Sequence, residues 1–443
     1  MAQAAHVALH RRGLAIILKA MVPQRTQRSR WLSNRTLAMV AAGLWIVAVV
    51  LAGFLLLRGG GPGTGDAAAG GPSSSSTPSV QAATTTAVVP TTTTTSTSTT
   101  LPPTTSSSTS STTTSSTLPP ALTLAAAGDV MGDRGVATFM SAHGAPAVFA
   151  KVKPVLEKAQ LAFVNLECPI SNVGSRKAGK EYTFRAPTIL TEGLVSAGID
   201  VVSMANNHVL DYGQAAFKDT LLRLNAVGVA HAGAGLNSTA AGTPALLITP
   251  AGTVAVLGFT GILPSGFIAT ADQGGVSPVT SDRKKLLASI AAAAKKADFV
   301  VVSVHWGVEY TGKANSEQRS LAHQMIDAGA DIVLGHHPHV IQGLEMYKDK
   351  LIAYSLGDFV FDHYSRATGE AFILWVALRQ EGPPVVDVLP VYVDDYTGVP
   401  ALVTGGEADV ILSRLIELSG NLGLKLVQDG DRARLADDPV VVP

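Results

Sequence analysis

The hydrophobic pattern of residues 122–362 is a series of short apolar runs, each of which stops at a cluster of polar residues. Runs of four to six β-forming residues predict buried strands. The runs are TLAAA before Gly128-Asp129, LAFV before Asn165-Leu166-Glu167, VVSMA before Asn206-Asn207-His208, FVVVSV before His305-Trp306-Gly307, DIVL before Gly335-His336-His337-Pro338-His339, and LIAY before Ser355-Leu356-Gly357-Asp358. Loops that leave the carboxyl ends of strands in an open α/β sheet converge on one crevice. Because several of these residues are metal-ligand types, the pattern predicts a composite metal site.

Helical periodicity alternates with these runs, which is typical of an α/β domain. The pattern predicts helices over residues 148–160, 214–227, 282–296, 316–328 and 407–424. Residues 245–249 and 253–259 flank a Pro-Ala-Gly turn signal and predict a hairpin, and residues 370–378 and 385–395 predict further strands. Two half-sheets are therefore expected.

A longer apolar run covers residues 37–57 and is uncharged. It has about the 20 residues that a helix needs to cross a bilayer. The preceding residues 1–36 carry six arginines and one lysine but no acidic residue, so the positive-inside rule places the N-terminus in the cytoplasm. We expect an uncleaved membrane anchor with an extracytoplasmic C-terminal domain; a cleaved signal peptide is the alternative, although its apolar core is normally only about 7–15 residues long.

Composition divides the rest of the chain. Residues 58–120 are almost entirely Gly, Ser, Thr, Pro and Ala, which predicts a disordered linker. We therefore expect a basic cytoplasmic tail (1–36), an anchor (37–57), a linker (58–120), a globular domain (121–400), and a C-terminal helix and tail (401–443).

Charge and cysteine content exclude some function classes. The formal net charge is +0, which argues against a general electrostatic grip on nucleic acid. Cys168 is the single cysteine, so no intramolecular disulfide and no cysteine-rich zinc module can form.

The sharpest chemical signal is His337-Pro338-His339, because an H-x-H pair after a strand can present two imidazoles to one cavity. His305 follows another predicted strand and could supply a third nitrogen. A lone histidine of this kind is as often structural as functional.

Acidic and amide residues follow the other strands. Asp129 is short enough to hold a cation rigidly, although an Asx turn is the alternative. Glu167 could ligate or bridge metals, or be a surface carboxylate. Asn207 offers an amide oxygen and His208 a proton donor beside it, a pairing that suits protonation of a leaving group; the Asn-Asn-His run could also be a polar turn.

Together the motifs GDVMGDR, NLECPIS, ANNHVLDYG, HWGVEY, GHHPHVIQG and YSLGDFVFD resemble the CapA family of poly-γ-glutamate capsule synthesis proteins. The resemblance covers about residues 123–395. It implies a metallophosphatase-like four-layer α/β/β/α sandwich and an N-terminal anchor with an external domain.

The wider metallophosphatase pattern implies roles residue by residue. It implies divalent metal, with Mn, Zn and Fe as candidates, bound by Asp129, Glu167, Asn207, His305, His337 and His339. His208 would be the general acid and Asp129 would share in catalysis, while Arg134, Arg185 and Asn206 would bind substrate. Met131 stands where the usual D-x-H histidine would be, and Glu167 replaces a bridging aspartate, so the number of metals stays open.

Two functions follow from the resemblance and the residues. One is an extracytoplasmic hydrolase acting on a phosphoester or an anionic polymer during capsule synthesis or export. The other is a non-catalytic accessory that holds an anionic polymer or assembles other membrane subunits of a synthase. A wall-binding module would show a row of aromatic residues, but these make up only 5% of the chain and form no row in the sequence.

Overall fold

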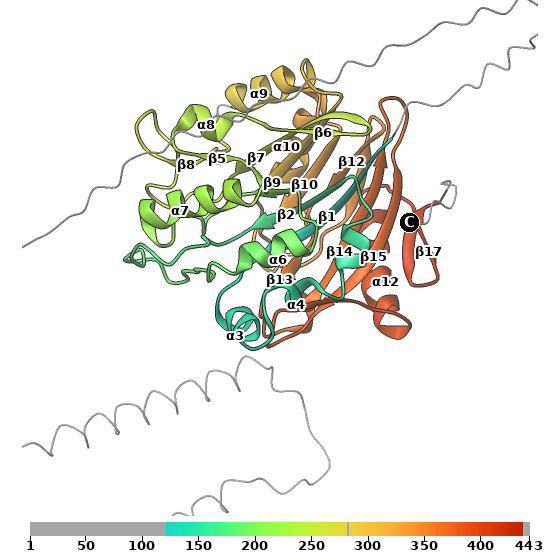
Figure 1. Cartoon of the computed structure of the whole chain (residues 1–443). Helices are drawn as coiled ribbons and strands as arrows, with labels where there is room; N and C mark the ends of the chain where they lie inside the picture. The colour runs from blue at the N-terminus through green and yellow to red at the C-terminus, as the bar shows by residue number, and fades with distance from the viewer. Residues whose placement is uncertain (1–120, 281–282, 437–443) are drawn as a thin grey trace, which may run out of the picture. The chain divides into compact units, whose positions relative to one another are not determined.

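The computed structural model describes residues 121–280 and 283–436 (Figure 1). The predicted tail, anchor and linker lie outside the described residues. Within the described ranges, we find no apolar helix of membrane-spanning length.

Two large β-sheets form the centre of the domain. The ten-stranded sheet runs in the order β17 (Leu426–Asp429), β18 (Arg432–Leu435), β15 (Val385–Val393), β14 (Glu370–Leu378), β1 (Leu122–Val130), β2 (Leu161–Leu166), β3 (Val201–Ser203) and β4 (Ala230–Ala232), with β13 (Asp358–Val360) paired to β1 and β16 (Pro400–Leu402) paired to β15. The six-stranded sheet runs in the order β11 (Leu344–Tyr347), β12 (Lys350–Ala353), β10 (Ile332–His336), β9 (Phe299–His305), β7 (Gly252–Thr260) and β6 (Ala245–Thr249). A small pair is formed by β5 (Ala234–Gly235) and β8 (Gly275–Val276).

The helices of the described residues are α3 (Arg134–His143), α4 (Pro146–Phe149), α5 (Lys153–Leu156), α6 (Leu190–Ser196), α7 (Gly213–Ala226), α8 (Ser238–Gly242), α9 (Lys284–Ala294), α10 (Ser316–Asp327), α11 (Arg366–Gly369) and α12 (Gly406–Gly420). Figure 1 shows α12 and β17, in red, on the opposite side of the domain from α8 and α9.

Alternation along the strands explains how both faces of each sheet are buried. In β1, Leu124 and Ala126 pack into the core between the two sheets, while Ala125 and Ala127 face the core under α4, α6 and α7. In β9, the alternate valines pack beneath α9 and α10. Because successive side chains point to opposite faces, a continuous apolar run fills two cores at once. The α/β class predicted from the sequence is confirmed.

Parallel pairing brings the polar residues at the strand ends together. Asp129 of β1 lies opposite Asn165 of β2 and also opposite Asp358 of β13. In the other sheet, His305 of β9 lies opposite His336 of β10. Both sheets therefore carry chemically reactive side chains at their carboxyl ends.

One predicted helix is wrong in detail. Residues 148–160 form the end of α4 and the short helix α5, with turns between and after them, rather than one continuous helix. Pro154 lies at the start of α5, where its missing N–H and its ring oppose continuation of the preceding helix. The predicted hairpin over residues 245–259 is formed by β6 and β7, and the hairpin of β17 and β18 was not predicted.

Helix α10 begins with a complete capping box. The Asn315 side chain accepts from the Gln318 N–H at 2.9 Å, and the Gln318 side chain accepts from the Asn315 N–H at 3.0 Å. We expect Asn315→Ala to lower the free energy of unfolding by about 1 kcal/mol, because it leaves N-terminal N–H groups of the helix without a partner. Urea denaturation of the full-length protein measures the change.

The matched control is Asn225→Ala, which removes an exposed asparagine near the end of α7. We expect it to change the free energy of unfolding by less than about 0.5 kcal/mol. Equal losses from both substitutions would contradict the capping role of Asn315.

Candidate metal centre

Asp129 is the fully buried carboxylate at the end of β1. Its Oδ1 accepts from Asn165 Nδ2 at 2.8 Å and lies 3.2 Å from His336 Nδ1, while its Oδ2 accepts from the His337 N–H at 3.2 Å. Burial alone would raise the pKa of Asp129, but the surrounding histidines, His336 foremost, hold it below its usual value. Asp129 is therefore a carboxylate held as an anion in the interior.

Glu167 directly follows β2 and is also fully buried. Neither carboxylate oxygen has a hydrogen-bond partner among the described residues. Burial, and then the nearby Asp129 carboxylate, raise the pKa of Glu167 well above its usual value. A buried carboxylate without hydrogen bonds is costly, and a bound cation is a common way to offset that cost.

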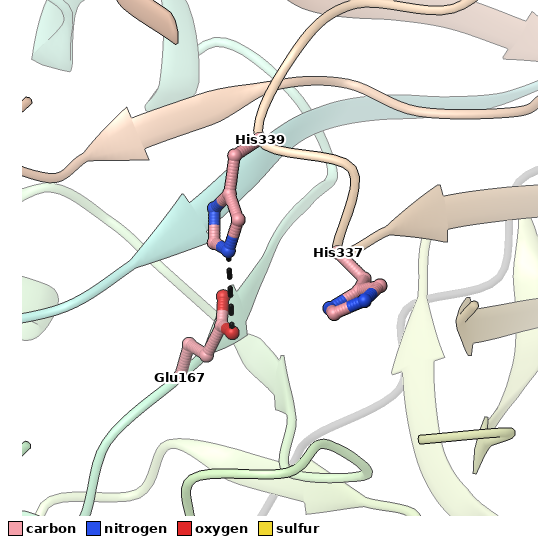
Figure 2. A group of neighbouring side chains, drawn as sticks. All are labelled: Glu167, His337 and His339. Carbon is pink, nitrogen blue, oxygen red and sulfur yellow. Dashed lines mark ion pairs between the residues drawn. The ribbon is translucent and has the colours of Figure 1, made fainter. Parts of the chain in front are cut away.

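Three histidines surround Glu167. His305 Nε2 lies 3.5 Å from Glu167 Oε1, and His339 Nε2 lies 4.0 Å from the same oxygen. Figure 2 shows the His339 ring directed at the Glu167 carboxylate, with His337 beside the pair on the loop after β10. His337 and His339 have positive φ angles of 97° and 55°, a backbone region that residues other than glycine rarely adopt. The folded loop maintains these unfavourable φ angles, and it directs the imidazole rings of both histidines toward Glu167.

The histidine protonation states differ within the cluster. Burial, and then the neighbouring histidines, lower the pKa of His305 well below its usual value and that of His337 to about 4. Burial also disfavours protonation of His339, but the Asp358 and Glu167 carboxylates raise its pKa well above the usual value. Neutral imidazoles such as His305 and His337 are the form that binds metals.

Asn207 and His208 lie at the edge of the same cluster. Asn207 Oδ1 is 2.8 Å from His305 Nε2, and His208 Nε2 is 3.9 Å from Glu167 Oε1. On its other side, His208 Nδ1 is 2.6 Å from Asp211 Oδ2, while Lys180 Nζ donates to Asp211 Oδ1 at 2.5 Å. Burial lowers the pKa of His208 to about 4, although Asp211 opposes this shift. Asp211 thus orients His208 with Nε2 toward the cluster.

Asp358, His336, Asp211 and Lys180 were not assigned roles from the sequence. Asp358 follows the LIAY run and its Oδ1 lies 2.8 Å from His339 Nδ1. Burial raises the pKa of Asp358 to about 6. The Gly-Asp pair after that run could have identified Asp358 as a further site residue. The contact between Asp211 and Lys180, in contrast, has no signature in the local sequence.

Met131 occupies the position of the missing histidine but does not face the cluster. It is fully buried in the core beneath the helices, and its sulfur accepts from the Asp133 N–H at 3.1 Å. Asp358, from a different strand, lies beside Asp129 instead. Asp358 thus adds a carboxylate to the groups that could hold a metal ion.

The three residues predicted to bind substrate lie in different environments. Arg134 lines the cavity above the cluster, and its guanidinium donates to Asp362 at 2.9 Å and 2.5 Å. Arg185 stacks on the ring of Tyr212 at 4.2 Å and does not line this cavity. Asn206 is fully buried and its amide group bonds within the chain, to Asn165, Leu166 and His208. The structure therefore brings only Arg134 to the cavity, and the substrate-binding roles of all three stay predictions.

The donor set fits a divalent transition metal. Three groups of side chains offer ligand atoms within 4.8 Å of one another, and they are Glu167 with His337 and His339, Asp129 with His339 and Asp358, and Asp129 with Glu167 and His305. Besides Glu167, His337 Nδ1 is buried without a hydrogen-bond partner in the described chain. Mixed imidazole and carboxylate ligands suit Mn, Zn and Fe. Six of the predicted residues thus lie in one cluster, and their roles as ligands stay predictions.

Fold and site together define an α/β protein with a buried carboxylate–imidazole centre at the strand ends of two sheets. The chain belongs to the family described as bacterial capsule synthesis protein PGA_cap, whose model matches residues 123–363. This agrees with the CapA resemblance found in the motifs.

Named relatives support this assignment. The chain is 36% identical to the capsule biosynthesis protein CapA of Bacillus anthracis, over 64% of this chain and 70% of the relative. It is 34% identical to the PGA biosynthesis protein CapA of Bacillus subtilis, over 70% of this chain and 81% of the relative. It is also 28% identical to a probable polyglutamine synthesis accessory protein of Mycobacterium tuberculosis, over 48% of this chain and 58% of the relative.

Proposed function

We propose that this protein is a membrane-anchored, extracytoplasmic member of a machinery that makes or exports a surface polymer such as capsular poly-γ-glutamate. Its domain is a metallophosphatase-like α/β/β/α sandwich with a metal-dependent hydrolase site for a phosphoester. The observation that carries the proposal is the buried cluster of Asp129, Glu167, Asn207, His305, His337 and His339 at the floor of a cavity. The relatives' names support the link to capsule synthesis.

The chain's own residues have distinct tasks in this proposal. Asp129, Glu167, Asn207 and the three histidines would hold a metal ion, which when bound would supply acidification of a water molecule and polarisation of a phosphoryl oxygen. His208 holds or moves a proton at Nε2, on the cavity side, and Asp211 keeps the ring in that orientation. Arg134 lies on the cavity wall, where it can contact a phosphoryl oxygen once its bonds to Asp362 are shared.

The N-terminal sequence supports the extracytoplasmic location of the domain. The apolar run of residues 37–57 would span the membrane, and residues 58–120 would carry the domain away from it. Other membrane subunits of a synthase are the expected partners. Surface labelling of intact cells with a membrane-impermeant reagent tests this topology.

A non-catalytic accessory function is the second candidate. The mycobacterial relative is named an accessory protein. The loss of the D-x-H histidine at Met131 also favours this candidate, because it removes one expected ligand. In that case the cluster would stabilise the fold or bind polymer without turnover.

We expect His208→Ala to lower the turnover of bis(p-nitrophenyl) phosphate by about 100-fold, because proton transfer to or from a reacting group contributes at least that much. Full-length protein loaded with Mn, Zn or Fe is assayed, and bound metal is measured by elemental analysis. Metal content should stay at the wild-type level, since His208 is not among the proposed ligands.

Asp211→Asn is the companion variant. Because Asp211 acts through His208, we expect a smaller fall in kcat, about tenfold, with KM unchanged. A metal-loaded protein without turnover, or one that His208→Ala leaves fully active, would favour the accessory function.

A further inference from the structure

A cavity of about 580 Å³ lies above the cluster of carboxylate and imidazole side chains. Asn207, His208, His339 and Asp358 contribute to its lining, so the cavity opens directly onto the cluster. This space is large enough for a ligand that extends beyond a phosphoryl group.

Exposed tyrosines gather around this cavity. Among the described residues, four tyrosines are strongly exposed: Tyr182 at 60%, Tyr310 at 67%, Tyr364 at 85% and Tyr396 at 77%. The first three line the cavity, and they come from three segments that are far apart in the sequence. Large aromatic rings left in water at one place, beside a cavity, are typical of a binding surface.

The backbone around each ring is anchored. Tyr310 has a φ of 60°, its N–H donates to Pro338 O at 2.8 Å, and its ring centre lies 6.2 Å from that of His339. Tyr182 lies two residues after Lys180, whose side chain donates to Asp211, and Tyr364 precedes Ser365, which caps α11. The rings are therefore presented on fixed loops, which reduces the entropy lost on binding.

The charges at the cavity favour a cationic ligand. The arginine and the lysine that line it each form an ion pair with a carboxylate, Arg134 with Asp362 and Lys180 with Asp211. The exposed carboxylates Glu181 and Glu309, in contrast, form no ion pair within the part of the chain that the structure describes, and both line the cavity. An anionic group would meet carboxylates at this rim, whereas an ammonium group would be attracted both by them and by the ring faces.

We propose that the aromatic–acidic mouth, formed by Tyr182, Tyr310, Tyr364, Glu181 and Glu309, binds an ammonium group of the substrate. The substrate class is a phosphoester whose alcohol carries a protonated or quaternary ammonium. The phosphoester part rests on the proposed function, but the ammonium site does not require turnover.

The first test compares two phosphodiesters of equal charge at phosphorus, p-nitrophenyl phosphorylcholine and its carbon isostere, p-nitrophenyl 3,3-dimethylbutyl phosphate. With full-length, metal-loaded protein, we expect kcat/KM to favour the choline ester by about tenfold, the effect of one well-placed cation–π contact. Tyr310→Leu and Glu309→Gln should each reduce this ratio, while Tyr396→Leu, the matched variant outside the cavity lining, should leave it unchanged. A ratio of one or less in the wild type, or a ratio that the cavity variants do not alter, would overturn the proposal.

The second test is independent of catalysis. Isothermal titration of the full-length protein with choline and with neutral 3,3-dimethylbutanol measures the site alone. We expect choline to bind about tenfold more tightly, and Tyr310→Leu to abolish the difference. If neither ester is hydrolysed but choline is still preferred, the hydrolase function fails and the ammonium site stands; equal binding of the two alcohols refutes the site itself.

Discussion

Replacing His339 by alanine is expected to remove most of the bound metal and to lower phosphodiester turnover by more than about 1000-fold. His339 belongs to two of the three groups of candidate ligands. Its Nε2 faces Glu167 and its Nδ1 lies 2.8 Å from Asp358, so the substitution removes both contacts. The effect should exceed the roughly 10–100-fold loss caused by removing a residue that only orients a ligand.

Elemental analysis and the rate of bis(p-nitrophenyl) phosphate hydrolysis measure the two effects. The matched control is His143→Ala, since His143 is an exposed histidine at the end of α3. Circular dichroism of both variants checks that the fold persists. A His339→Ala protein that keeps its metal and its activity would show that the cluster is not the centre of the chemistry.

Gly335→Ala is expected to lower the free energy of unfolding by about 3 kcal/mol, at the upper end of the usual cost of overfilling a packed interior. A Cβ at this position would lie 2.0 Å from Tyr354 O and 2.7 Å from Trp306 Nε1. Trp306 Nε1 donates to the same Tyr354 oxygen at 3.0 Å, so neither neighbour can move without losing that bond. The methyl group would push β10 away from the end of β12.

Equilibrium denaturation of the full-length protein measures the loss. Gly420→Ala is the matched control, because Gly420 ends α12, is exposed, and has open space where the alanine Cβ would lie. It should be neutral or stabilising by up to about 1 kcal/mol. Since Gly335 lies two residues before His337, Gly335→Ala should also reduce metal binding, and wild-type stability and metal content would contradict the close packing around Gly335.

The hydrophobic pattern of a single segment was sufficient to predict the strands. The runs before Asp129, Glu167 and His305 are strands because each is apolar on both faces, and the structure buries them between two cores. The prediction over residues 148–160 was wrong because Pro154 interrupts the helix although the apolar periodicity of the segment is helical.

Local pattern was insufficient where partners come from distant segments. The sequence shows three tyrosines in unrelated loops and no aromatic row, whereas the fold places Tyr182, Tyr310 and Tyr364 around one cavity. The sequence likewise gives no sign that the Arg185 guanidinium stacks on the ring of Tyr212.

By itself the sequence determined the α/β class, the family and the residue types at the strand ends, because apolar periodicity and short motifs are properties of contiguous residues. Only the tertiary structure decided that Asp358 joins Asp129, that Asp211 and Lys180 lie behind His208, and that Met131 turns away into a core. These contacts depend on the pairing of strands that are remote in sequence and on the packing of the loops after them. No local signal encodes such distances, since they arise from the joint packing of both sheets.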